Sequence, residues 1–184
     1  MEGKETSNRK IRFGIKAGVS IANVKIEYNP GTTPGNGKPT SKLGALAGVF
    51  ARMDLGKNAC FQPELLMVGK GMKENNQNYS YRTDLTYLEL PLNILYTPAT
   101  SKGSFFIGGG LAPAYYIGKN VFYSGYTGFK KFDFGINILT GYESPMGFSI
   151  NLHYTYGLLN ISGNRTDIPV AKNRCFGLSV GYTF

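Results

Sequence analysis

The chain has 184 residues, of which 25 are glycine, and it contains no tryptophan although aromatic residues make up 14 %. This length fits one domain, and the abundance of glycine, tyrosine and phenylalanine favours strands over helices. The formal net charge is +9, but no basic helical face or nucleic-acid-binding motif accompanies it, so we expect no nucleic-acid partner.

No segment approaches eighteen uninterrupted apolar residues, which excludes a membrane-spanning helix. A transmembrane β-barrel is not excluded, because its wall needs apolar residues only at alternate positions. Residues 1–11 form a polar N-terminal segment without the apolar core of a secretory signal. We expect the barrel domain to occupy residues 12–184 and a signal peptide to have been removed.

Eight segments alternate between apolar residues and small or polar residues, as strands with two different faces do. We predict strands at 12–23, 42–55, 60–72, 84–96, 104–117, 130–142, 148–158 and 174–184. The last segment alternates most regularly and ends on an aromatic residue, with Phe176, Leu178, Val180, Tyr182 and Phe184 on one face. An even number of antiparallel strands predicts an all-β, eight-stranded, up-and-down transmembrane barrel.

The connections between these segments alternate in length. Residues 25–41, 73–83, 118–129 and 159–171 form long polar loops, whereas 56–58, 97–103 and 143–146 form tight links. Outer-membrane barrels have long extracellular loops and short periplasmic turns. We therefore expect the four long loops outside the cell, where they are available to protein or glycan ligands.

Aromatic residues recur on the apolar face near the short turns. In outer-membrane barrels such rings form a girdle at the level of the lipid headgroups. We predict a periplasmic girdle of Phe13, Phe61, Tyr96, Phe105, Tyr142, Phe148, Tyr182 and Phe184. Three prolines, Pro63, Pro91 and Pro113, fall within predicted strands, where we expect bulges or frayed pairing because proline lacks a backbone donor.

The opposite face carries charges of both signs. The interior of an eight-stranded barrel is just wide enough for its own side chains to fill, and buried charges need partners. We predict a lumen network made of Arg12, Lys16, Arg52, Asp54, Glu64, Lys70, Glu89, Asp133 and His153. A narrow solute or ion path is the alternative to this plug.

No cofactor or metal site is predicted, because one histidine and two distant cysteines cannot supply a closed ligand set. Cys60 and Cys175 begin strands at opposite ends of the barrel, so we expect no disulfide. The phosphates of a lipopolysaccharide leaflet would suit the basic residues near the long loops, namely Lys25, Lys38, Lys42, Lys119, Lys130, Lys172 and Arg174.

Several short motifs resemble those of the small outer-membrane barrel proteins of Bacteroidetes, described as porin-like or PorT-like. They are FGIKAGVSIAN (13–23), PELLMVGKG (63–71), YLELPL (87–92), DFGINILTGYE (133–143), YGLLNI (156–161) and the terminal GLSVGYTF. The resemblance implies a barrel similar to OmpA- and OmpX-type barrels, located in the outer membrane and inserted by the barrel-assembly machinery through its C-terminal strand. It carries no shared catalytic residues.

These observations favour a non-enzymatic outer-membrane protein with a structural or interaction role. Two alternatives come from other classes. A lipid-modifying outer-membrane enzyme would need a nucleophile and an acid near His153, and no such motif accompanies it. A soluble lipocalin-like barrel would place the apolar residues inside, and the alternation alone does not say which face is inside.

Overall fold

The computed structural model describes residues 11–27, 38–75, 80–100, 103–118, 130–162 and 170–184. The alternating segments form ten strands: β1 (Ile11–Glu27), β2 (Lys38–Asp54), β3 (Ala59–Asn75), β4 (Ser80–Glu89), β5 (Leu92–Tyr96), β6 (Ala99–Thr100), β7 (Gly103–Tyr116), β8 (Phe132–Glu143), β9 (Phe148–Gly157) and β10 (Val170–Thr183). Among the described residues no helix is long and apolar enough to cross a membrane.

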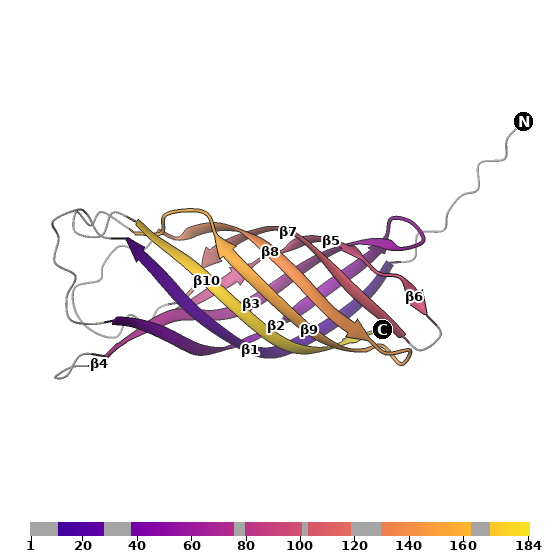
Figure 1. The fold of residues 1–184 in the computed structure, drawn as a ribbon, viewed down its shortest axis with the longest axis horizontal. Coiled ribbons are helices and arrows are strands. Elements are labelled where there is room, and N and C mark those ends of the chain that lie inside the picture. Colours follow the sequence, from indigo (N-terminus) through magenta and orange to yellow (C-terminus); the bar gives the residue numbers. More distant parts are fainter. Residues whose placement is uncertain (1–10, 28–37, 76–79, 101–102, 119–129, 163–169) are drawn as a thin grey trace, which may run out of the picture.

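All neighbouring strands pair antiparallel, and the sheet closes on itself because β1 pairs with both β2 and β10. The strands β4, β5 and β6 keep one register against β7, so together they form one barrel strand with two interruptions. Eight strands therefore surround the barrel axis, and Figure 1 shows them tilted along an elongated cylinder. The predicted eight-stranded antiparallel barrel is confirmed.

Several strands are longer than the alternation of apolar residues predicts. β1 continues to Glu27 rather than ending at Asn23, β2 begins at Lys38 rather than Lys42, and β3 continues to Asn75. Backbone pairing satisfies N–H and C=O groups whatever the side chains are. At β1, β2 and β3 the barrel wall therefore extends past the apolar segments.

Apolar side chains of the strands face outward, toward the surroundings of the barrel. Residues such as Ile15, Ile138, Ile150 and Val180 are exposed, whereas Glu89 and Asp133 are buried inside. A soluble barrel would bury the first group and expose the second. The lipocalin-like alternative is therefore wrong.

The three prolines lie next to one another on neighbouring strands. β4 ends before Leu90 and Pro91, and the β2–β3 ladder skips the pair opposite Pro63. Pro113 stays within β7, where its carbonyl accepts the N–H of Leu90 at 2.9 Å. Frayed pairing at the prolines is confirmed, but the register is unchanged on both sides, so the expected bulges are absent there.

One register shift does occur, between Ser41 and Leu46 of β2, opposite the glycine-rich part of β3. Gly71 has a φ of 128° at this position, which glycine adopts without strain. At this irregularity Gly69, Lys70 and Gly71 have no paired residue on β2. Ser20 Oγ donates to the carbonyl of Gly69 at 2.6 Å, and Lys42 Nζ donates to that of Lys70 at 3.1 Å.

Candidate functional site: the barrel lumen and its two ends

We use "turn end" for the end of the barrel where β2–β3, β6–β7 and β8–β9 connect, and "loop end" for the opposite end. At the turn end, the carboxylate of Glu143 at the end of β8 contacts donor groups from three other strands. Its Oε2 lies 2.6 Å from Arg52 Nη1 and 2.9 Å from Thr183 Oγ1, and its Oε1 lies 3.6 Å from Arg12 Nη1. Arg12 also pairs with Asp54 at 3.2 Å.

The network continues from Arg52 deeper into the lumen. Arg52 Nε donates to Gln62 Oε1 at 2.8 Å, and Gln62 Nε2 donates to Glu64 Oε1 at 2.7 Å. Glu64 Oε2 then lies 2.6 Å from Lys16 Nζ. The guanidinium of Arg52 also lies over the rings of Phe50 and Phe106, at 5.7 and 5.3 Å from their centroids. Polar side chains of several strands are thereby held in fixed positions.

Further polar pairs lie toward the loop end, between strands that are neighbours or one strand apart. Lys70 forms an ion pair with Glu89, and its ammonium lies 5.1 Å from the ring centroid of Tyr87. Asp133 accepts a hydrogen bond of 2.8 Å from Asn173 Nδ2. All five residues are buried. The charges of Lys70 and Glu89 compensate each other, as buried charges require, and the Asp133 carboxylate accepts from a neutral amide.

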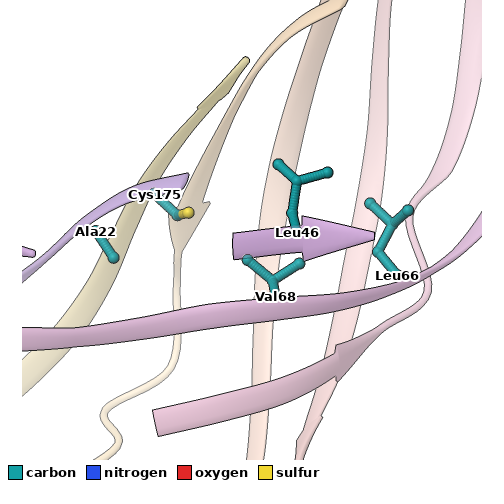
Figure 2. Close-up of a cluster of buried hydrophobic side chains, with 5 residues drawn as sticks. All are labelled: Ala22, Leu46, Leu66, Val68 and Cys175. Atoms are coloured by element: carbon teal, nitrogen blue, oxygen red, sulfur yellow. The ribbon is translucent and has the colours of Figure 1, made fainter. Parts of the chain in front are cut away.

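Buried apolar side chains lie between these polar groups. Figure 2 shows one cluster inside the wall, formed by Ala22, Leu46, Leu66, Val68 and Cys175. A second contains Cys60, Leu95, Phe106 and Leu139, and a third contains Leu85, Tyr87 and Ala114. Cys60 and Cys175 are free thiols in different clusters. Polar side chains and apolar clusters both line the described part of the lumen.

The predicted lumen residues differ in their surroundings. Lys16, Arg52, Glu64, Lys70, Glu89, Asp133 and His153 are buried. Arg12 and Asp54 lie at the mouth of the turn end, where their side chains keep 36 % and 41 % exposure. His153 is buried but has no hydrogen-bond partner among the described residues, and its charged neighbours are Lys16 and Lys70 rather than carboxylates.

Two charged members of the network, Glu143 and Lys42, were not predicted from the sequence. Glu143 was predicted in a turn, although the alternation of Asn137, Leu139 and Gly141 continues inward to this residue. Lys42 was predicted among the basic residues that face lipopolysaccharide, and this was wrong. Lys42 is buried and forms an ion pair with Asp84, because it belongs to the same inward-facing row of β2 as Leu46 and Phe50.

The predicted girdle residues all lie on the outer surface at the turn end. Phe13, Tyr96, Phe105, Phe148 and Phe184 are exposed, and Phe61, Tyr142 and Tyr182 are half-buried. Adjacent rings contact one another: Phe105 and Tyr142 have centroids 4.9 Å apart, as do Phe148 and Tyr182. The ring of Tyr182 also meets that of Phe184 edge-on at 5.4 Å.

Comparison with protein families decides the class of this barrel. The model of the outer membrane protein beta-barrel domain matches residues 4–163, which is most of the chain. The chain belongs to this family. The location that follows from the family and the fold is the bacterial outer membrane.

Solved structures support the same fold. The outer membrane protein OprG from Pseudomonas aeruginosa aligns with a TM-score of 0.58 at 13 % identity, covering 96 % of this chain and 97 % of that one. Neisserial surface protein A aligns with a TM-score of 0.51 at 14 % identity, covering 94 % and 97 %. The outer membrane enzyme PagL aligns with a TM-score of 0.53 at 12 % identity, covering 92 % and 98 %.

At these identities the likeness concerns the fold alone, and the three proteins do not share one role. A search of curated proteins finds no significant match. In the described part of the chain, no group of three or more histidine, cysteine or acidic residues is arranged to hold a metal ion.

Proposed function

We propose that this family member is a non-enzymatic protein of the outer membrane whose lumen is closed by its own side chains and whose long loops contact other molecules. The observation that carries the proposal is the continuous chain of contacts from Arg12 through Glu143, Arg52 and Gln62 to Glu64. Together with the apolar clusters, this chain leaves no role for the lumen charges beyond mutual pairing.

The orientation is part of the proposal. The aromatic residues at the turn end form the periplasmic girdle, and the loop end faces the outside of the cell, as is usual for outer-membrane barrels. The predicted long loops 25–41, 73–83, 118–129 and 159–171 lie in part outside the described residues, as do Lys119 and the side chain of Lys38. We also propose that this protein is one of the PorT-like barrels of Bacteroidetes. We further propose that the barrel-assembly machinery inserts it.

Planar-bilayer recording tests whether the lumen is closed. We expect no steady single-channel conductance from the full chain, under conditions where a general porin in the same bilayer conducts. A stable unitary conductance would overturn the closed lumen and favour the narrow channel. An R52A/E143A variant serves as a sensitivity control, because transient current from this variant alone would locate the plug at the turn end.

A catalytic role lacks a structural basis at the single histidine. A general base needs a nucleophile within hydrogen-bond reach and an acid that orients it. His153 makes no hydrogen bond to a described residue, and a Cβ on Gly177 of the neighbouring strand would overlap its ring. Incubation with lipid A and phospholipids, followed by mass spectrometry of the lipids, should show no new product. Deacylation lost in H153A would overturn this part.

A further inference from the structure

The carboxylate of Asp133 is a buried charge that the lumen pairs do not compensate. Each buried lysine, arginine and glutamate of the described lumen has an oppositely charged partner, whereas Asp133 forms no ion pair with a described residue. It accepts hydrogen bonds of 2.8 Å from Asn173 Nδ2 and from the backbone N–H of Phe134, and both donors are neutral. An ionised carboxylate is costly to bury without a counter-charge, so this group needs a cation.

A buried lysine close to Asp133 does not supply this charge. Lys70 lies within electrostatic range of both Glu89 and Asp133, but its ammonium forms the ion pair with Glu89. One positive charge between two carboxylates leaves one negative charge. Lys131 is near Asp133 in the sequence, but it is exposed.

Two tyrosine hydroxyls in the same part of the lumen also lack a partner. Tyr87 is fully buried, and its hydroxyl lies within interaction range of the Asn173 amide and the Asp133 carboxylate. The ring of Tyr116 lies 5.6 Å from that of Tyr87 between centroids. Neither hydroxyl forms a hydrogen bond with a described residue. Buried polar groups nearly always have a partner, so these oxygens are available to a ligand.

The strand pairing brings these side chains together from four strands. Tyr87 of β4 lies opposite Tyr116 of β7. Ala114, two residues before Tyr116, lies opposite Asp133 of β8. Asn173 belongs to β10 and reaches Asp133 across β9. The carboxylate, the amide and the two hydroxyls therefore share one region of the lumen toward the loop end.

Small residues leave room beside the carboxylate. Ala114 is the inward residue opposite Asp133, and the next inward positions on β8 and β9 are Gly135 and Gly157, which lie opposite each other. These three positions place no bulky side chain over the Asp133 carboxylate. A small ligand can therefore approach its oxygens.

The donor atoms favour a hard cation with a single charge. They are one carboxylate, two hydroxyls and the Oδ1 atom of Asn173, whose Nδ2 is already donated to Asp133. All of these ligands are oxygen atoms, which metal cations such as sodium and potassium accept. Calcium takes six to eight oxygens, commonly from several carboxylates, and zinc takes mainly nitrogen and sulfur. A single carboxylate balances a single positive charge.

We propose that the loop-end part of the lumen contains a binding site for one monovalent metal cation, sodium or potassium. The ligands are Asp133, Asn173, Tyr87 and Tyr116. The ion compensates the carboxylate and satisfies the two hydroxyl oxygens. It stays bound within the barrel, and the contacts from Arg12 to Glu64 keep the turn end closed.

The dependence of stability on the cation tests the site. The full chain is unfolded by urea in zwitterionic vesicles containing sodium chloride, potassium chloride or N-methyl-D-glucamine chloride at constant ionic strength. A ligand that binds only the folded barrel stabilises it by mass action, so the parent protein should be more stable in sodium or potassium. Its folding equilibrium constant should rise by up to about tenfold for each tenfold increase in the metal cation. Equal stability in all three salts would overturn the proposal.

Three variants assign the response to the site. D133N should lose the response to sodium and potassium, and in N-methyl-D-glucamine it should be at least as stable as the parent, because it removes a buried charge. Y87F keeps the ring and should weaken the apparent cation affinity about two- to tenfold. The matched control D54N removes a carboxylate at the turn end and should respond like the parent. A response that persists in D133N would overturn the site.

Thallium(I), a heavy cation that replaces potassium, locates the ion. Anomalous diffraction from crystals soaked in a thallium(I) salt should show thallium beside the Asp133 carboxylate in the parent and not in D133N. Thallium bound only at other positions would overturn the proposal. Heat-dependent gel mobility confirms that each variant is folded. These measurements concern neither conductance nor lipid chemistry, so they can fail while the proposed function stands, and the reverse also holds.

Discussion

Lys16 and Glu64 form an ion pair of 2.6 Å inside the barrel, with side chains only 1 % and 2 % exposed. The two residues come from β1 and β3, which are separated by β2, so their pair passes over the inner face of β2 instead of joining neighbouring strands. Charges so deeply buried have no solvent to replace a missing partner.

Removing one partner of this pair should therefore be costly. We expect K16M to lower the free energy of unfolding by about 3–5 kcal/mol, because Glu64 stays buried without its cation. The double variant K16M/E64M should recover most of this loss. Urea unfolding in lipid vesicles, followed by gel mobility, measures both. If K16M were as stable as the parent protein, water would have to reach Glu64.

The register shift in β2 predicts that alanine substitutions of two buried serines differ in their effect on stability. Ser20 Oγ satisfies the carbonyl of Gly69 at 2.6 Å, whereas Ser179 Oγ has no partner among the described residues. S20A should cost about 1–3 kcal/mol, because a buried acceptor loses its donor. S179A should be neutral within error in the same unfolding assay. Similar values for both would contradict the role of Ser20.

Gly177 and His153 should show strong coupling. A Cβ at residue 177 would overlap the imidazole ring of His153, so G177A should destabilise the barrel by about 1–3 kcal/mol through overpacking. H153A removes the ring, and G177A should then cost much less in the H153A background. A double-mutant cycle measures this coupling. Additive effects would place the ring elsewhere in the lumen.

The absence of tryptophan makes membrane depth measurable with single introduced residues. Ile138 is exposed and lies five residues before Glu143, about 12 Å above the turn end on a strand tilted by about 40°. I138W should be quenched most by lipids brominated deep in their chains. F148W should be quenched by lipids brominated near the headgroup. The opposite order would overturn the assigned membrane position.

Alternation was sufficient to predict the faces of the strands, because in a barrel each side chain of a strand meets either lipid or lumen. It predicted Glu64, Lys70 and Glu89 as inward residues, and each is buried with a basic or acidic partner. It was insufficient for the strand ends, since pairing continues through polar residues such as Lys38 and Glu27.

The side-chain pairs that form across the lumen could not be predicted from the sequence either. The distance between Glu143 and Arg52 depends on strand tilt and on the register of several ladders, none of which a single strand encodes. The shift in β2 likewise has no local signature, because one additional residue between Ser41 and Leu46 leaves the apolar pattern almost unchanged. Lys42 was predicted at the surface from its position beside a long loop, although the alternation of β2 directs it inward, to Asp84.

The pairing of β1 with β10 has a consequence for assembly. These strands contact each other along fourteen residue pairs, from Gly14 with Thr183 to Glu27 with Val170, and they are the most distant in sequence. During synthesis the first strand is made long before its second neighbour exists, so one of its edges stays open and prone to wrong pairing. During export of this protein, the open edge of β1 must therefore be kept from pairing with other chains until β10 is available.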